Sequence, residues 1–378
     1  MMRNKIEQFV ADNTQKMYSM IKELCDIPAP SNFEHKRAEY CKNWLENIGA
    51  ANVYIDEALN VIFPLNCETS NEITVFAAHT DTVFPDTEPM PYFDDGEKIH
   101  SPGVADDTAS VVVLLMMAKF FVENSIIPES GILFVFNSCE EGLGNLKGTR
   151  KLFSEFNNRI ARFITFDSDL DVVNDVCVGS HRYEVEVLTE GGHSYGDFGN
   201  TNAISVASQI VNEIYKIQVP EKEGTKTTYN VGIFSGGTSV NTIAQDAKFL
   251  CEYRSDDMEC LSYMKKQFDA IFEKAEEPGV KIKITKVGDR PCANIDSSKI
   301  EEIKALVVPE IESVINKKVL FKSSSTDCNI PLSKGIPALC VGVNIHEGMH
   351  TREEWMDKES IVCGLKIAIL IGIKLMEE

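Results

Sequence analysis

Three short segments of the chain carry side chains that could hold divalent metal ions. They are the runs AHTD at residues 78–81, GVADD at residues 103–107 and CEEG at residues 139–142. Neutral imidazole and ionised carboxylates are common ligands of zinc and related ions. A further carboxylate beside such an ion can take a proton from water. The three segments therefore indicate a metal-dependent hydrolase.

The first segment follows an apolar run over residues 73–78, which predicts a buried strand. In an extended chain, side chains two residues apart point to the same side, so His79 and Asp81 can face one site. We expect His79 to be a metal ligand and Asp81 to orient it, because a ligating histidine usually donates its other ring N–H to an oxygen. Taken alone, the pair is also compatible with a histidine in a simple strand-end turn.

The second and third segments place acidic pairs next to predicted elements. Asp106 and Asp107 precede a predicted helix that begins near Ala109, so they could also be ordinary N-terminal capping residues. Glu140 and Glu141 follow the apolar run 131–137, at the end of a predicted strand. Two neighbouring carboxylates are costly there unless a cation lies between them or one is protonated. A metal ion is therefore the simplest explanation for the glutamate pair.

Two further ligands come from later strand ends. Asp167 follows the strand-like residues 163–166, with Asp169 as its alternative, and His350 follows the apolar run 338–343, with His346 as its alternative. Open α/β sheets place their sites at the carboxyl ends of parallel strands. Strand ends of one sheet that each deliver a metal-competent side chain are improbable by chance.

The apolar periodicity predicts an α/β protein with an inserted domain. Strands alternate with helices and are almost continuously apolar, which is typical of a mostly parallel sheet covered by helices on both faces. From about residue 178 the pattern changes to half-exposed strands with two amphipathic helices, typical of an α+β layer. A length of 378 residues also exceeds what one core usually serves. We predict a catalytic domain of residues 1–177 and 292–378 and an inserted domain of residues 178–291.

Individual elements can be placed from the same periodicity. Predicted helices cover residues 109–122, 203–217, 260–275, 300–315 and 360–376. Predicted strands cover residues 61–65, 73–78, 131–137, 183–188, 249–254, 280–284 and 338–343.

Composition narrows the partners and the compartment. The formal net charge of -21, with no basic tract, argues against a nucleic-acid partner. The last apolar segment, residues 361–376, is short for a bilayer and contains lysines, so we expect no membrane association. The 11 cysteines show no disulfide-like spacing, and the first residues lack the apolar stretch of a secretory signal. We therefore expect a cytoplasmic protein.

The runs AAHTD, GVADD and SCEEG, with MHTREEW at residues 349–355, resemble a family of co-catalytic zinc exopeptidases. This family includes peptidase T, carboxypeptidase G, aminoacylase and the acetylornithine and succinyl-diaminopimelate deacylases. The resemblance extends over essentially the whole chain, because GGHS at residues 191–194, GGTSVN at 236–241 and SSTD at 324–327 also match. It implies a catalytic domain with two metal ions and an inserted, ferredoxin-like dimerisation or lid domain.

Carried over to this sequence, the resemblance implies a role for each residue. His79 and Glu141 would bind one zinc ion, Asp167 and His350 the other, and Asp106 both; Co²⁺ or Mn²⁺ could replace zinc. Glu140 would be the general base that takes a proton from the shared water, and Asp81 would orient His79. In the substrate site, the resemblance assigns the oxyanion, the carbonyl and the terminal carboxylate to His193, Asn241 and Arg254.

The resemblance also implies a homodimer, formed through the inserted domain, in which His193 reaches the partner's site. Two substrate classes fit the same metals: di- and tripeptides, cleaved by an exopeptidase, and N-acyl amino acids, cleaved by a deacylase. We favour the peptidase, because the runs GGHSYGDFG and SSTDCNIPLSKGIPA look like those of the peptidase members. A catalytically silent binding or scaffold protein would be expected to lack Glu140 or a ligand, and none is missing.

Overall fold

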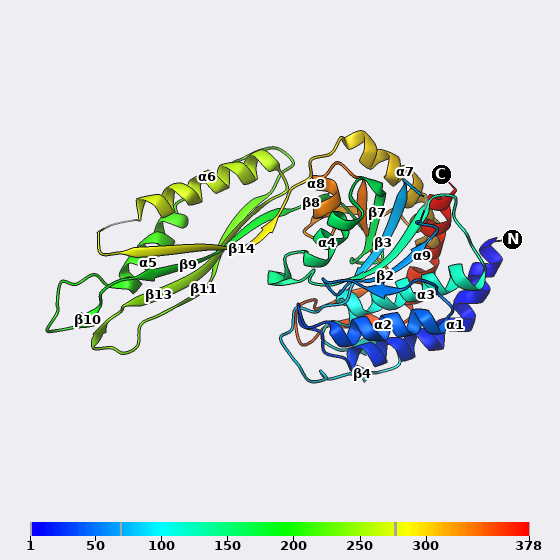
Figure 1. Cartoon of the computed structure of the whole chain (residues 1–378), viewed down its shortest axis with the longest axis horizontal. Coiled ribbons are helices and arrows are strands. Elements are labelled where there is room, and N and C mark those ends of the chain that lie inside the picture. The colour runs from blue at the N-terminus through cyan, green and yellow to red at the C-terminus, as the bar shows by residue number, and fades with distance from the viewer. Residues whose placement is uncertain (1, 69, 276–277, 378) are drawn as a thin grey trace. The chain divides into compact units, whose positions relative to one another are not determined.

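The chain folds into two compact units. The computed structural model describes residues 2–68, 70–275 and 278–377. Unit 1 comprises Met1–Cys177 and Asn294–Glu378, and unit 2 comprises Val178–Ala293. The chain returns to unit 1 two residues later than the predicted boundary after residue 291. Figure 1 shows the elements of both units.

Unit 1 is built on one large sheet whose central strands are parallel. The strand order is β1-β2-β6-β3-β7-β16-β8-β15. Strands β6, β3, β7 and β16 run parallel to one another, and β15 runs parallel to β8, whereas β1–β2, β2–β6 and β16–β8 are antiparallel pairs. Their bounds are Tyr54–Ile55 (β1), Val61–Leu65 (β2), Ile73–His79 (β3), Gly131–Asn137 (β6), Ile160–Phe166 (β7), Val172–Cys177 (β8), Leu320–Ser324 (β15) and Ala338–Val341 (β16).

Helices cover this sheet because its central strands are apolar on both faces. Every residue of β3 and β6 is buried, which is the expected state of parallel strands between helical layers. The helix α3 packs against both strands and against α9, and α4 packs against α8. The helices of the unit are Met2–Cys25 (α1), His35–Asn47 (α2), Ala109–Glu123 (α3), Lys147–Glu155 (α4), Ser297–Ile315 (α7), Asn329–Ser333 (α8) and Ser360–Met376 (α9).

A small second sheet of unit 1 joins two loops that are distant in sequence. It has the order β17-β18-β5-β4, with β4 at Phe93–Asp94, β5 at Lys98–His100, β17 at His346–Glu347 and β18 at Trp355–Asp357. Trp355 pairs with His100 and Met356 with Ile99. This pairing brings the segment that carries His350 next to the segment that leads to Asp106.

Unit 2 is a ferredoxin-like layer of four antiparallel strands and two helices. Its elements follow one another as β9 (Gly179–Leu188), α5 (Ala203–Ile214), β11 (Thr227–Gly236), β13 (Asp246–Ser255), α6 (Met258–Lys274) and β14 (Lys281–Arg290). The spatial order is β11-β13-β9-β14, so the chain forms a βαββαβ unit. A short pair, β10 (Gly192–His193) with β12 (Thr242–Ile243), lies outside this sheet.

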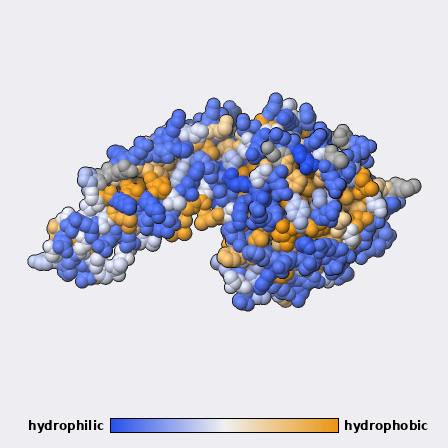
Figure 2. All heavy atoms as spheres, in the orientation of Figure 1, coloured by the Kyte–Doolittle hydropathy of each residue, from blue (hydrophilic) through white to orange (hydrophobic). Residues whose placement is uncertain are grey.

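The predicted fold class is confirmed, with differences in individual elements. The helix predicted over residues 203–217 ends at Ile214, and the strand predicted over residues 338–343 ends at Val341. Strands β8, β11 and β15 were not predicted. No helix in the described ranges has the length and apolarity needed to cross a membrane. Figure 2 shows a mostly hydrophilic surface with smaller apolar patches on the visible face.

Candidate metal centre

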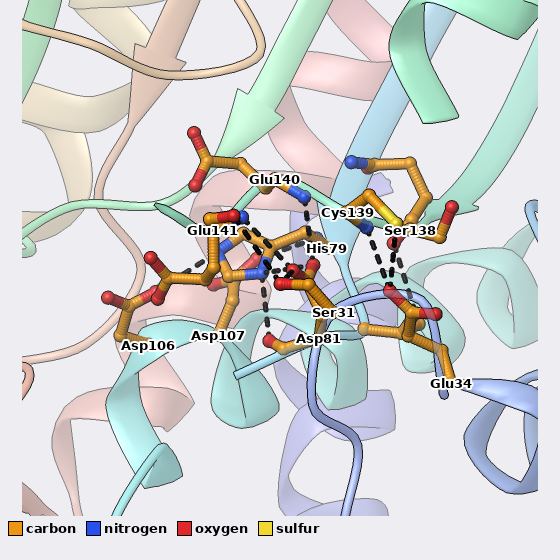
Figure 3. Close-up of polar contacts among 12 residues, drawn as sticks. Ser31, Glu34, His79, Asp81, Asp106, Asp107, Ser138, Cys139, Glu140 and Glu141 are labelled. Carbon is orange, nitrogen blue, oxygen red and sulfur yellow. Dashed lines mark hydrogen bonds and ion pairs between the residues drawn. The ribbon is translucent and has the colours of Figure 1, made fainter. Parts of the chain in front are cut away.

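Two histidines contact the carboxylate of Asp106, one at each of its oxygens. The Nε2 atom of His79 lies 3.0 Å from Oδ1 of Asp106, and Nε2 of His350 lies 2.9 Å from Oδ2. The same His350 atom is 3.2 Å from Oε1 of Glu141. Strand ends β3 and β6 supply His79 and Glu141, and Asp106 lies in the turn that precedes α3 (Figure 3). The structure thus brings together the residues proposed to share the two ions.

Asp81 connects His79 with both glutamates. Its Oδ1 accepts the backbone N–H of Glu140 at 2.9 Å and its Oδ2 accepts that of Glu141 at 3.0 Å. The hydroxyl of Ser31 donates to Oδ2 at 2.6 Å. On the histidine side, Nδ1 of His79 lies 3.0 Å from the backbone oxygen of Asp81 and 3.4 Å from its Oδ1. The main chain and the carboxylate of Asp81 therefore both lie close to Nδ1 of His79 (Figure 3).

Asp106 and Asp107 do not cap helix α3. Both have non-helical backbone angles inside the turn Val104–Thr108, and no side chain caps the helix. Asp107 is fully buried, and its Oδ2 accepts the backbone N–H of His79 at 2.9 Å. This arrangement removes the capping explanation for the aspartate pair.

The contacts favour Asp167 and His350 over their alternatives. Possible ligand atoms of Asp167, His79 and Asp107 lie within 4.8 Å of one another. Asp169 instead approaches Nδ1 of His346 at 3.7 Å, and this same nitrogen lies 2.8 Å from Oδ1 of Asn344.

The pKa values of the centre reflect crowded negative charge. Burial opposes protonation of His79, but the carboxylates around it, Asp107 first, raise the pKa of His79 well above its ordinary value. Hydrogen bonds with Asp106 and Glu141 raise the pKa of His350 to about 11. Burial, with a contribution from Asp106, raises the pKa of Glu141 to about 8. The same two causes raise the pKa of Asp167. The centre therefore favours positive charge among its carboxylates.

These residues fit a pair of divalent ions. Oδ1 of Asp107 is buried and accepts no hydrogen bond within the part of the chain that the structure describes. The buried Oε1 of Glu141 lies 3.2 Å from Nε2 of His350, which it shares with Asp106. Buried carboxylate oxygens without donors are costly in a protein interior. Mixed carboxylate and imidazole ligands suit zinc, cobalt and manganese. The donor set is thus appropriate for metal ions.

Glu140 directly precedes Glu141 in the segment after β6, and the residue is 5% exposed. Asp327, from the SSTD run, is buried and contacts Asn137, the last residue of β6, and Thr149 of α4. It accepts hydrogen bonds from Nδ2 of Asn137, at 2.6 Å, and from the hydroxyl of Thr149. Burial first, and then the charge of Glu140, raise the pKa of Asp327 to about 7. Glu140 and Asp327 are therefore close enough to influence each other electrostatically.

Two supporting residues were not identified from the sequence. Arg37 is fully buried and donates to the backbone oxygens of Leu24, Ile27 and Thr80, and the last of these lies between His79 and Asp81. Glu354 accepts backbone N–H groups from the turn before Asp106. Their partners are backbone atoms, which no residue pattern reveals; only the proximity of Glu354 to His350 in the MHTREEW run could have drawn attention to it.

The three residues expected to bind substrate lie in unit 2. His193 and Asn241 are exposed neighbours in the loops around β10 and β12, where the backbone N–H of Ser194 donates to the backbone oxygen of Asn241 at 3.0 Å. Arg254 lies at the far end of β13 from these loops, where its Nε and Nη2 donate to Glu252 at 2.7 and 2.9 Å. The fold of unit 2 brings His193 and Asn241 together and keeps Arg254 apart from them.

One family model and several known proteins are similar to this chain over most of its length. A family model described as peptidase family M20/M25/M40 matches residues 75–371. The uncharacterized protein YqjE of Bacillus subtilis is 23% identical over 380 residues, which cover 95% of this chain and 98% of YqjE.

Two solved structures share the fold over nearly the full length. A tripeptidase from Staphylococcus aureus has a TM-score of 0.73 at 21% identity, covering 97% of this chain and 99% of its own. The YXEP protein of Bacillus subtilis, a dinuclear metal-binding peptidase, has a TM-score of 0.64 at 15% identity, covering 97% and 99%.

Proposed function

Because the chain belongs to peptidase family M20/M25/M40, we propose that it is an exopeptidase that hydrolyses di- and tripeptides with two divalent metal ions. The chain is thus a hydrolase of the metallopeptidase type. The number of ions, the substrate class and the roles of individual residues form the proposal.

The arrangement of Asp106 is the observation that carries the proposal. Its two carboxylate oxygens each face a different histidine, at 3.0 and 2.9 Å. A carboxylate that presents one oxygen to each of two imidazoles can bridge two ions, each of which also takes one histidine. Glu141 lies close to His350, and Asp107 and Asp167 lie close to His79.

The contacts favour one distribution of ligands between the two ions. Glu141 lies next to His350, so we assign these two residues to one ion. Asp167 lies close to His79, so we assign these two to the other ion, with Asp106 shared. The resemblance alone suggested the other pairing, with Glu141 beside His79 and Asp167 beside His350. Zinc is our first choice for both ions, with Co²⁺ and Mn²⁺ as alternatives.

The protein residues carry the proton and hold the reacting groups. When bound, the ions would supply Lewis acidity that polarises the scissile carbonyl and lowers the pKa of a water molecule. Glu140 takes the proton of that water and passes it to the leaving amine. Asp81 keeps the backbone of Glu140 and Glu141 in register with His79, since its carboxylate accepts both N–H groups.

His193 can donate a hydrogen bond to the oxyanion that forms when water attacks the scissile carbonyl. Its Nδ1 accepts the backbone N–H groups of Tyr195 and Gly196 at 3.3 and 3.2 Å. In a neutral imidazole the other nitrogen then carries the proton. The side chain is exposed, so its Nε2–H is available to a substrate, and Asn241 beside it would help to hold the carbonyl.

The distance between His193 and Arg254 supports a homodimer. Asn241, the neighbour of His193, lies just before the first residue of β13, Asp246, whereas Arg254 is near its last residue, Ser255. At roughly 3.3 Å per strand residue, Asp246 and Arg254 lie about 26 Å apart. A short peptide cannot reach both ends of one unit 2. We propose that Arg254 of one copy and His193 of another meet the same substrate.

A substrate screen tests the proposed function. The protein would be incubated with dipeptides, tripeptides and N-acetyl amino acids, each with and without a chelator, and product amines would be measured. We expect hydrolysis of the peptides that stops with chelator and returns on addition of Zn²⁺, Co²⁺ or Mn²⁺. Turnover of acylated amino acids alone would replace the peptidase by a deacylase. No turnover and no bound metal would indicate a silent scaffold. We also propose a cytoplasmic location, supported by the 11 cysteines, an odd number without the spacing of a disulfide framework.

A further inference from the structure

Glu354 is a buried carboxylate bound by the turn that carries Asp106. Its Oε2 accepts the backbone N–H of Gly103 at 2.8 Å. Its Oε1 accepts the N–H groups of Ala105 at 2.8 Å and of Asp106 itself at 3.1 Å. Only 1% of Glu354 is exposed. Both oxygens are thus committed to one short stretch of backbone some 250 residues away in sequence.

The backbone N–H groups of this turn need an acceptor from outside it, because the turn does not have the regular hydrogen bonds of a helix or a strand. Gly103 has a φ of 74°, and a Cβ added there would lie 2.6 Å from the Cγ2 of Thr82. Asp106 has non-helical angles of φ -111° and ψ 89°. Buried N–H groups in such a turn require partners from elsewhere in the fold. Glu354 supplies the partners for three of them.

Glu354 also belongs to the segment that carries His350. The two residues are four positions apart, and β18 begins directly after Glu354. Main-chain contacts add to those of the side chain: the N–H of Ser101 donates to the backbone oxygen of Glu354 at 3.2 Å, and Trp355 pairs with His100. One residue therefore ties the loop of one histidine ligand to the turn of the shared aspartate.

We infer that Glu354 is a positioning residue that sets the distance between Asp106 and His350 and thereby preorganises the site for its metal ions. The inference rests on the proposed metal-dependent function. It assigns a purpose to a carboxylate whose burial close to the acidic centre would otherwise be costly. Residues that hold metal ligands in place commonly contribute 10- to 100-fold to metal affinity.

The test compares two adjacent glutamates. Glu354→Gln keeps the shape of the side chain, but its amide N–H₂ group faces an N–H donor of the turn, so at least one hydrogen bond is lost. Glu353→Gln makes the same change at an exposed neighbour and is the matched control. Affinity and stoichiometry for Zn²⁺ and Mn²⁺ would be measured on metal-free protein by calorimetry and by mass spectrometry.

We expect Glu354→Gln to weaken metal binding by about 10- to 100-fold, and Glu353→Gln to leave it unchanged. The kcat of Glu354→Gln at limiting metal should fall and recover as metal is raised, with little change in KM. A residue that only stabilises the fold would instead lower the unfolding temperature of the metal-free protein and leave metal affinity unchanged. Wild-type affinity in Glu354→Gln would overturn the inference.

The outcomes separate this inference from the proposed function. If the wild-type protein binds no metal, the proposed function fails. If the wild-type protein and Glu354→Gln bind metal equally well, only the role of Glu354 fails. Should Glu354→Gln not fold, amide exchange in the wild-type protein gives the answer. In the wild-type protein we expect slow amide exchange at Gly103, Ala105 and Asp106, and in Glu354→Asp we expect faster exchange at the same residues. Exchange in the wild-type protein as fast as in an unstructured peptide would refute the positioning role of Glu354.

Discussion

The candidate metal centre of unit 1 and the β10–β12 loops of unit 2 both carry predicted functional residues, but in opposite surroundings. At the candidate metal centre, buried carboxylates accept hydrogen bonds from backbone N–H groups of distant segments. In the loops, His193 is exposed, and Tyr195 and Phe198 beside it are each 90% exposed. A site formed within one chain buries its polar groups and satisfies them with hydrogen bonds. Exposed aromatic side chains are instead typical of surfaces that bind another molecule.

This difference suggests a division of labour. In the proposed function, unit 1 alone supplies the metal ligands and the general base, and unit 2 supplies a hydrogen-bond donor to the site of a partner molecule. Changes in unit 1 should then act within one chain, and changes in the loops should act across a dimer. The following experiments test that distinction, beginning with the largest expected effect.

Replacing the proposed base should give the largest loss of turnover. Glu140→Gln removes the proton acceptor and keeps the size of the side chain, so we expect kcat to fall by about 10²- to 10⁴-fold. Bound metal, measured by mass spectrometry, should stay near the wild-type value. Glu353→Gln is the control for the loss of one acidic charge. Near-normal turnover in Glu140→Gln would remove Glu140 from the mechanism.

Loss of the loop histidine should give the next largest effect. His193→Ala removes the N–H donor proposed for the oxyanion, which typically costs roughly 100-fold in kcat. Metal content should not change, because His193 is not a proposed ligand. His35→Ala, at an exposed position on unit 1, is the control. If metal content fell together with kcat, His193 would act through the metal centre and the contrast between the two regions would fail.

Mixing the two inactive variants tests the division of labour directly. In a dimer of Glu140→Gln with His193→Ala, one site has an intact Glu140 from one copy and an intact His193 from the other. After subunit exchange, we expect activity to recover to about a quarter of wild type, since half the dimers are mixed and each has one complete site. No recovery in a mixture shown to contain mixed dimers would place His193 and Glu140 of a single chain in the same site.

Arg254 should affect binding more than turnover. Arg254→Ala removes a guanidinium that Glu252 holds in place, and hydrogen bonds to charged groups are worth about 1.5–3 kcal/mol. We expect KM for tripeptides to rise by roughly 10- to 100-fold with a smaller change in kcat. Lys248→Ala, on the same strand and paired with Glu184, is the control. An unchanged KM would show that the substrate carboxylate binds elsewhere.

Metal binding should stabilise unit 1 more than unit 2. At a free metal concentration of 100 times Kd, each ion contributes about 2.7 kcal/mol to the folded state. We expect the unfolding temperature to rise by roughly 5 °C or more on adding metal to metal-free protein. Amide exchange should slow around residues 103–108 and 138–141 and stay constant in β9 and β13. Equal slowing in both units would contradict a centre confined to unit 1.

The sequence placed the fully buried central strands accurately and missed strands at or next to a sheet edge, such as β8, β11 and β15. The largely apolar strands β3 and β6 were placed to within one residue, because burial on both faces favours long runs of apolar side chains. Strand β11 was missed because most of its residues are exposed at the edge of the sheet of unit 2, and Asn230, Gly232 and Gly236 weaken the strand signal of its sequence. The exposed strand β15 was missed for the same reason.

The site divides in a similar way. Glu141 and His350 could be proposed from residue type and strand-end position, whereas Asp106, which precedes a helix, was proposed as a ligand only through the family resemblance. Asp107 was identified only as a possible cap, because its contact with the backbone of His79 depends on the path of the turn. Glu354 and Arg37 could not be assigned a role, since they bind backbone groups that every sequence offers. Contacts between distant loops follow from tertiary folding, which one sequence does not display.

The metal content of the wild-type protein and of Asp106→Asn tests the central claim most directly. Both would be purified in metal-buffered solution and measured by mass spectrometry in parallel with the protein concentration. The account predicts two divalent ions per wild-type chain and a loss of both from Asp106→Asn, because this carboxylate serves both ions. One ion or none in the wild-type protein, or two ions retained by Asp106→Asn, would contradict it.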